Sequence, residues 1–282
     1  MAQSIITKSD YQKALDQVVY YKEPNLGFLK ITGPDRLDFI QRQSTNDMNE
    51  LQDGGVITTV LTSSIARVVD VLQLFQIGED YYIMTLSGHG KSTSDFLTSK
   101  IFFMDKVVIA NLADDYAKII LEGPKSGKLI KQLGIVNPPQ KNHFLIAKTN
   151  NIEIKLVAHE GLGSEIGYSI LLPKSAQTDF LELLHKQDIT ELSTQTREIL
   201  RVEAIQPGPR AELVQDYTPL EANLGWAISD SKGCYTGQEV IARQITYDKV
   251  NKRLVLIQAE EKMNAGATIR AEGKNVGKIT SA

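Results

Sequence analysis

Apolar and polar residues alternate along the chain with two different periods, which together predict a mixture of strands and helices. Helical spacing is found at 10–19, 90–103, 174–187 and 194–205, and in a short helix that begins at 33–35. Alternation typical of strands is found at 28–32, 56–61, 67–76, 80–86, 106–110, 116–122, 143–147, 151–158, 166–172, 253–258 and 268–271. Neighbouring strands follow one another as hairpins rather than as regular strand-helix-strand units, which indicates an α+β fold.

The strongest break in these patterns is Gln206-Pro-Gly-Pro-Arg210, through which no helix can continue. From residue 252 onward the pattern changes to short strands separated by glycine turns. The last residues, 276–282, end directly after a strand pattern. A strand without a closing neighbour is an unusual natural end, so we expect the sequence to be a shortened form of a longer protein.

Composition narrows the class of protein. A length of 282 residues suits two or three packed units, and the net charge of −3 gives no general attraction to nucleic acid. The N-terminus lacks the features of a secretory signal, and no apolar run reaches the length of a membrane span. One cysteine excludes an internal disulfide, and the four histidines (His89, His143, His159 and His185) show no metal-ligand spacing. We expect a cytoplasmic monomer without a metal site, and assign no role to the histidines.

The segment from Lys232 to Glu239, KGCYTGQE, carries the candidate chemistry. Thr236 and Glu239 have the spacing of a capping box, which predicts that a helix begins here. Cys234 precedes that helix, and both the positive end of the helix dipole and the ammonium of Lys232 favour a thiolate. Two interpretations remain open: a reactive or ligand-donating thiol, or a small buried hydrophobic residue beside a glycine turn.

This octapeptide, followed by Val240–Arg243, resembles the signature of the YgfZ branch of the glycine-cleavage T-protein (aminomethyltransferase) superfamily. Further segments resemble that superfamily in the same order: Arg36 and Phe39 with Thr45-Asn46-Asp47, Arg67–Asp70, Gly163–Tyr168, and Leu200–Ala204 with Pro219–Glu221. The resemblance implies a T-protein-like cloverleaf of two interleaved folate-domain halves plus an incomplete C-terminal β-barrel. The first half would comprise 1–50 with about 118–200, the second 51–117 with about 201–250, and the barrel would start within 251–282.

The resemblance also implies a central channel that binds tetrahydrofolate or a one-carbon derivative of it. Glu203 matches the carboxylate that accepts the two parallel donors of a reduced pterin. Cations would hold the glutamate tail, and aromatic rings would line the channel. The candidates are Arg243, Arg210 and Lys232 as cations, Tyr235, Tyr168 and Trp226 as rings, and Asn46 as a polar contact; Trp226 lies in an apolar run that also predicts a core position.

Asp70 is the second candidate catalytic residue beside Cys234. In T-proteins an aspartate at this element is thought to assist aminomethyl transfer by organising the folate amine and the leaving ammonia. T-proteins carry paired aspartates there, whereas this chain has Asp70-Val71. Asp70 is equally consistent with a polar residue at a strand edge.

Two functions follow from the resemblance. The first is a tetrahydrofolate-binding accessory protein that supports iron–sulfur cluster assembly or repair in client proteins, with Cys234 as the essential thiol. The alternative is an aminomethyltransferase that transfers a one-carbon unit to tetrahydrofolate and acts with a lipoyl carrier protein or on a small methylated amine. The missing second aspartate favours the first function.

Overall fold

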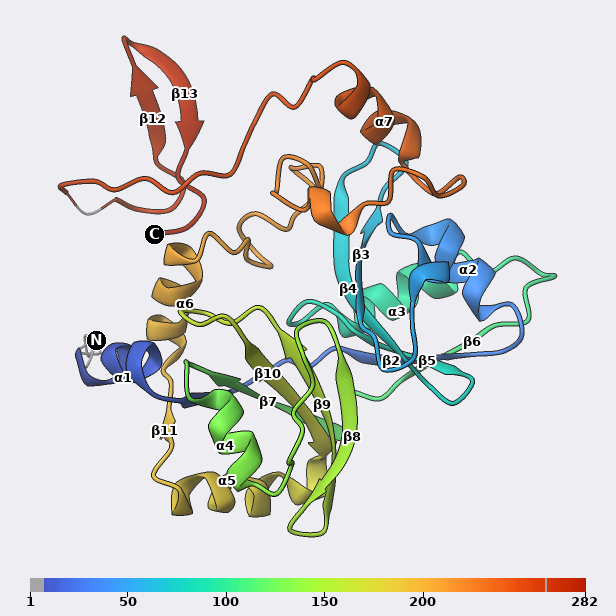
Figure 1. The fold of residues 1–282 in the computed structure, drawn as a ribbon. Coiled ribbons are helices and arrows are strands. Elements are labelled where there is room, and N and C mark those ends of the chain that lie inside the picture. The colour runs from blue at the N-terminus through green and yellow to red at the C-terminus, as the bar shows by residue number, and fades with distance from the viewer. Residues whose placement is uncertain (1–7, 262) are drawn as a thin grey trace.

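A computed structural model describes residues 8–261 and 263–282, which form two β-sheets with flanking helices and a separate hairpin (Figure 1). The helices are α1 (Lys8–Asp16), α2 (Arg36–Gln43), α3 (Gly90–Thr98), α4 (Ser126–Gln132), α5 (Gln177–Lys186), α6 (Thr194–Glu203) and α7 (Gln238–Thr246). The strands are β1 (Val19–Lys22), β2 (Phe28–Thr32), β3 (Ile57–Thr62), β4 (Val68–Ile77), β5 (Asp80–Met84), β6 (Val108–Asn111), β7 (Tyr116–Glu122), β8 (Phe144–Thr149), β9 (Ile152–His159), β10 (Gly167–Pro173), β11 (Thr190–Glu191), β12 (Thr268–Ala271) and β13 (Lys274–Lys278). No helix in the described ranges has the length and apolar character that crossing a membrane requires.

The first sheet has six strands in the order β11-β1-β7-β10-β9-β8. All its neighbours are antiparallel except β1 and β11, which run parallel. The helices α4 and α5 cover one face of it, where Leu129, Ile130, Phe180 and Leu184 pack against buried strand residues. Alternation along the strands therefore leaves the opposite face of this sheet turned toward the rest of the molecule.

The second sheet has five antiparallel strands in the order β3-β4-β5-β2-β6. The helices α2 and α3 cover its outer face through Phe39, Ile40 and Leu97. The two sheets meet in a smaller apolar core, where Phe28 and Phe75 of the five-stranded sheet join Val157 and Leu171 of the six-stranded sheet in one cluster. This contact fixes the two sheets relative to each other.

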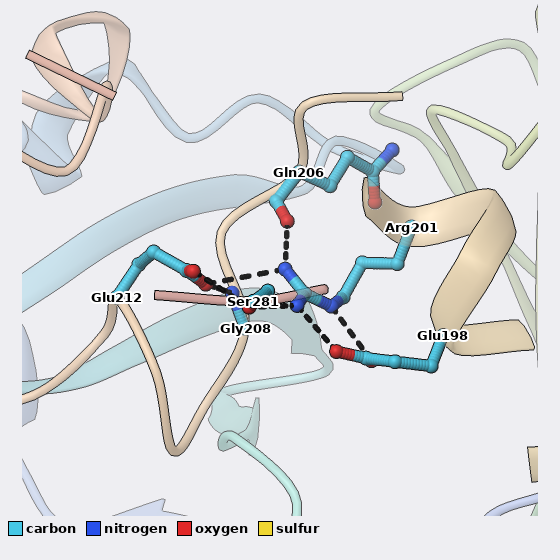
Figure 2. Close-up of polar contacts among 6 residues, drawn as sticks. All are labelled: Glu198, Arg201, Gln206, Gly208, Glu212 and Ser281. Atoms are coloured by element: carbon cyan, nitrogen blue, oxygen red, sulfur yellow. Dashed lines mark hydrogen bonds and ion pairs between the residues drawn. The ribbon is translucent and has the colours of Figure 1, made fainter. Parts of the chain in front are cut away.

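The segment after α6 leads from the six-stranded sheet to the five-stranded sheet, where Leu213 and Leu224 pack against Val60 and Val68, and then continues into α7 and the β12–β13 hairpin, which projects away from the sheets (Figure 1). Buried Arg201 holds this crossing in place (Figure 2). Its guanidinium donates to the backbone oxygen of Gln206, lies 3.2 Å from Oε2 of Glu212, and donates to Ser281 Oγ at 2.5 Å. Glu198 adds an ion pair at 2.5 Å. One arginine thus ties α6, the Pro-Gly-Pro turn and the end of the described chain together.

The predicted α+β class is confirmed, and several elements match closely. Strands 28–32, 116–122 and 268–271 have the predicted bounds. Two predictions were wrong at their ends: the helix at 10–19 stops at Asp16, because the next residues pair as β1 with β7, and the helix at 90–103 stops at Thr98. The predicted strand at 253–258 is also wrong, since this segment pairs with no strand among the described residues. Helix α4 and strand β11 were not predicted.

The predicted division of the chain into interleaved halves and an incomplete barrel stays a prediction. Strand pairing gives one fact that bears on its boundaries. Strand β2, within residues 1–50, pairs with β5 and β6. By hydrogen bonding it therefore belongs with the strands of 57–111 rather than with those of 118–200.

Candidate functional site

The KGCYTGQE segment is anchored to the end of α2 by Lys232, whose side chain is buried. Its Nζ donates to the backbone oxygens of Gln41 at 2.8 Å, Ser44 at 2.7 Å and Asn46 at 2.6 Å. An ammonium has three N–H donors, so all of them are satisfied by the protein. Burial lowers the pKa of Lys232 to about 8, although Asp47 opposes this shift. A folate contact from Lys232 stays a prediction; here its ammonium fixes the backbone that carries Cys234.

Cys234 is exposed, two residues beyond this anchor. The interpretation of Cys234 as a small buried hydrophobic residue is therefore wrong. The predicted capping box is also wrong: α7 begins at Gln238, and the residue before it is Gly237 in the left-handed conformation, with no side-chain cap. A Cβ on Gly237 would lie 2.7 Å from the backbone oxygen of Ser63, so the β3–β4 turn decides how this helix starts.

The Thr45-Asn46-Asp47 segment supplies one of the backbone oxygens that Lys232 binds, that of Asn46. Thr45 Oγ1 donates to the backbone oxygen of Ala227 at 2.7 Å, and Asn46 Nδ2 donates to that of Thr58 at 2.9 Å. The backbone N–H of Asn49 is the largest of the effects that lower the pKa of Asp47. The amide of Asn46 is thus engaged in local hydrogen bonds, and its predicted contact with folate stays a prediction.

Asp70 lies on β4 and is completely buried against the start of α3. Its Oδ1 accepts from the backbone N–H of Val71 at 2.8 Å and of Leu86 at 3.1 Å, and its Oδ2 accepts from Thr93 Oγ1. Burial raises the pKa of Asp70 to about 6 against the effect of these donors. The interpretation of Asp70 as a polar residue at a strand edge does not describe this position, because the carboxylate is enclosed.

His89 connects this enclosed carboxylate to the surface. Its Nδ1 lies 3.6 Å from Oδ1 of Asp70, and about a quarter of its side chain is exposed, at 26%. Arg210 approaches the same loop, with Nη2 3.6 Å from where a Cβ on Gly88 would stand. We assigned His89 no role from sequence. Its position just before a helix pattern was visible in the sequence, but its contact with Asp70 of β4 was not.

Glu203 is the last residue of α6 and is exposed. Its Oε2 accepts a hydrogen bond from the Tyr11 hydroxyl at 2.8 Å, and this bond is the main reason that the pKa of Tyr11 is raised. A ligand that displaces the Tyr11 hydroxyl can therefore reach the Glu203 carboxylate. Pterin binding by Glu203 stays a prediction.

The remaining predicted residues do not converge on one place. Arg243 is exposed on α7, and Tyr235 is partly buried with Lys232 Nζ 5.2 Å from its ring centre. Tyr168 is buried in the core beneath α4 and α5, a position that gives its predicted folate contact no support. Trp226 is 66% exposed, so the predicted core position for it is wrong.

The arrangement supports two kinds of chemistry. The Cys234 thiol is open to solvent on a backbone that Lys232 holds, which suits attack on, or ligation of, a partner's atom. The partly exposed imidazole of His89 lies within ion-pair distance of the Asp70 carboxylate, so in this pair the imidazole is the group that a ligand can reach. Asp70 itself cannot touch a ligand in this conformation, because no part of it is exposed.

Comparison with known proteins identifies similar sequences over nearly the whole chain. The family model described as "GCVT N-terminal domain" matches residues 5–232. The chloroplastic "Putative transferase At1g60990" of Arabidopsis thaliana is 30% identical over 271 residues, which are 94% of this chain and 61% of that protein. The aminomethyltransferase of Bacillus subtilis is 26% identical over 283 residues, 97% of this chain and 78% of the relative.

A solved structure matches the fold. The crystal structure of glycine cleavage system aminomethyltransferase T from Bartonella henselae aligns with a TM-score of 0.79 at 17% identity, covering 97% of this chain and 76% of the other. At this identity the likeness concerns the fold alone. The chain spans about three fifths of the Arabidopsis relative and about three quarters of the two bacterial proteins.

Proposed function

This chain belongs to the GCVT N-terminal domain family, and on that premise we propose that it is a tetrahydrofolate-binding accessory protein that supports iron–sulfur cluster assembly or repair. Cys234 is its working thiol. One observation carries the proposal: the thiol is exposed on a backbone segment that buried Lys232 fixes through three carbonyls. Unpaired cysteines are among the most frequently buried residues, so an exposed one in a fixed segment is best explained by its chemistry.

Iron–sulfur chemistry suits such a thiol because thiolate sulfur is the usual protein ligand of these clusters. One exposed cysteine per chain can supply one ligand or attack one sulfur atom, but it cannot hold a cluster by itself. The client protein would supply the remaining ligands. The accessory role therefore agrees with a chain that has Cys234 as its only cysteine.

Folate is the proposed small-molecule ligand because of family membership. The exposed carboxylate of Glu203 and the cations Arg210 and Arg243 are the candidates for its polar contacts. Of the two cations, Arg210 has more structural support, because its guanidinium lies beside Gly88, the residue before His89. Localisation in the cytoplasm and action as a monomer remain part of this proposal.

An aminomethyltransferase is the second candidate, and the Asp70–His89 contact favours it. A carboxylate 3.6 Å from a partly exposed imidazole can assist a proton transfer at the folate amine. The burial of Asp70 weakens this candidate in its simplest form, because the carboxylate cannot contact the amine directly. An assay for methylene-tetrahydrofolate from an aminomethyl-lipoyl donor tests it, and absence of product above background excludes it.

The deciding experiment is complementation of a strain that lacks this protein, with iron–sulfur enzyme activity as the measurement. We expect Cys234→Ala and Cys234→Ser to fail and Ser231→Ala, an exposed control directly before the same segment, to rescue. Protein levels are compared by immunoblot so that loss of folding is not mistaken for loss of function. Full rescue by Cys234→Ala would refute the proposal.

A further inference from the structure

The segment between α7 and the β12–β13 hairpin has the composition of a strand but no partner strand. Its residues 252–261 read KRLVLIQAEE, with an apolar run that favours a strand. Within the described ranges, however, no strand pairs with this segment, and its backbone makes no hydrogen bond to another described residue (Figure 1). The strand pattern of segment 252–261 is therefore unused within one chain.

The apolar side chains of this segment lie on the surface. Val255 is 63% exposed, Leu256 51% and Ile257 47%. They line a hollow of about 660 Å³, whose other walls include Ile205, next to the end of α6, and Val276 of the hairpin. Both of these side chains are exposed as well. Removing such a surface from water is favourable in proportion to its area, so this face suits a partner that brings an apolar strand.

The charges of the segment are complementary to those of the same segment run in reverse. Lys252 and Arg253 stand at one end, Glu260 and Glu261 stand at the other, and only uncharged residues lie between. Among the described residues these four form a single ion pair, in which exposed Arg253 lies 3.9 Å from Asp248, and such surface pairs are weak. Two copies of the segment that run antiparallel therefore bring the basic end of each beside the acidic end of the other.

Two-fold symmetry restricts the register of such a pair. A two-fold axis between neighbouring antiparallel strands runs perpendicular to the sheet, so it leaves every side chain on its own face. Residues directly opposite each other share a face, and faces alternate along a strand, so opposite residues must be an even number of positions apart. A register centred on Leu256 meets this condition, with Val255 of one copy opposite Ile257 of the other.

The register centred on Leu256 also pairs the charges. Lys252 of each copy lies opposite Glu260 of the other, and Arg253 lies diagonally from Glu261, within reach of its long side chain. Symmetry makes each of these pairs twice. Moving the centre by one residue in either direction would set Glu260 opposite an apolar residue, Leu254 or Val250. Charge therefore selects one register among those that symmetry allows.

We propose that segment 252–261 forms a reversible dimer by pairing antiparallel with the same segment of a second copy. The pairing gives the free backbone groups partners and covers the exposed apolar side chains. An interface that uses the same patch on both copies stops the association at two chains. The inference goes beyond the proposed function: Cys234 and Glu203 lie outside the segment, so each chain carries its own candidate site and can act singly.

Sedimentation velocity of the full chain over a range of concentrations tests the dimer. The wild type should change from monomer to dimer as the concentration rises. Reversal of the basic end (Lys252→Glu with Arg253→Glu) or of the acidic end (Glu260→Lys with Glu261→Lys) places like charges opposite each other. We expect either double substitution to weaken the dimer by about tenfold or more.

A mixture of the two double-substituted chains gives the sharper result. Each repels its own copy, but the all-acidic segment of one complements the all-basic segment of the other. We therefore expect an equimolar mixture to form a heterodimer about as tightly as the wild type forms its homodimer. The matched control, Lys128→Glu with Lys131→Glu, makes the same change of net charge at exposed residues of α4 and should dimerise like the wild type.

Three outcomes would overturn the inference, provided that melting curves show the variants to be folded. The first is a wild-type chain that stays monomeric at every concentration, which would leave the face to a partner other than a second copy. The second is a dimer that survives both charge reversals, since it would use another surface. The third is a series of larger species without a defined size. Complementation, which tests the proposed function, is measured separately and decides neither result.

Discussion

The ammonium of Lys232 donates to the backbone oxygen of Asn46 at 2.6 Å, across 186 residues of sequence. The contact joins the two segments that make this chain most recognisable, KGCYTGQE and Thr45-Asn46-Asp47. It also explains why a lysine stands at this position, since a compact ammonium on a long stem can reach three converging carbonyls. The segment with the exposed thiol is therefore held by the core of the protein rather than by its own helix.

Replacing Lys232 by methionine should destabilise the fold. The change leaves the carbonyls of Gln41, Ser44 and Asn46 without their donor, and each buried unpaired group costs about 1–3 kcal/mol. We expect the free energy of unfolding in urea to fall by about 3 kcal/mol or more. Lys249→Met, at an exposed lysine, is the control and should change it by less than about 0.5 kcal/mol. If Lys232→Met lowers the free energy of unfolding no more than Lys249→Met does, the three hydrogen bonds of Lys232 contribute little to stability.

Cys234 should react as an exposed thiol in the folded protein. With one cysteine in the chain, a thiol-specific chromogenic disulfide should release one equivalent per chain without denaturant. The rate should lie within about tenfold of that in urea, because folding does not cover the sulfur. Cys234→Ser gives the blank. A thiol that reacts only after unfolding would contradict the exposed position.

Gly237→Ala should destabilise the start of α7, whereas Gly233→Ala should not. Gly237 has φ of +84°, and an added Cβ would lie 2.7 Å from the Ser63 oxygen. Gly233 has no atom within 4 Å of that position and no positive φ. A non-glycine residue in this conformation costs about 1–3 kcal/mol before any clash is counted. Urea unfolding of the two variants measures the difference, and equal stabilities would contradict the geometry.

Removal of Asp70 and removal of His89 should have different consequences. Asp70→Ala leaves two backbone N–H groups and the Thr93 hydroxyl without their acceptor, so we expect a loss of about 2–4 kcal/mol in unfolding free energy. His89→Ala removes a partly exposed ring and should cost less than about 1 kcal/mol. If His89 meets a ligand, its replacement lowers ligand-dependent activity in a folded protein. Similar stability losses in both variants would contradict this division of roles.

Glu122 should give the stability of the protein a specific pH dependence. Its pKa is about 7 in the folded state against an ordinary value of 4.5. Between these values the folded state binds the proton more strongly, so the contribution of Glu122 is full below about pH 4.5 and is lost as pH rises through about 7. Glu122→Gln does not titrate, and its advantage over wild type should grow across this window, to about 3 kcal/mol at most.

Urea unfolding of wild type and Glu122→Gln at a series of pH values measures that growth. The lowered pKa of His159 acts in the opposite direction, because the folded state holds its proton less strongly. This second contribution is present in both proteins, so it cancels to a first approximation in the difference between them. A difference that stays constant from pH 4.5 to 7 would contradict the buried, proton-binding state of Glu122.

Particular elements show which parts of the fold could be predicted from the sequence and which could not. The alternation of Phe28–Thr32 and Tyr116–Glu122 is local, so both strands were predictable with their exact bounds. The short β1 was not, because Val19–Lys22 continues a helical spacing and becomes a strand only by pairing with β7. The capping box failed for a similar reason, since the β3–β4 turn beside Gly237 decides where α7 begins.

The sequence alone determined the α+β class and the family resemblance, because these depend on local spacing and on motifs, and for the same reason it could single out the segment around Cys234 as a candidate site. Only the tertiary structure decided that Lys232 anchors this segment, that Asp70 meets His89, and that Glu122 and His159 converge over Gly167. Such meetings depend on the register between strands and on the packing of helices far apart in the chain. For the three that lie on strands, Asp70, Glu122 and His159, a shift of one residue in register would turn the side chain to the other face of the sheet.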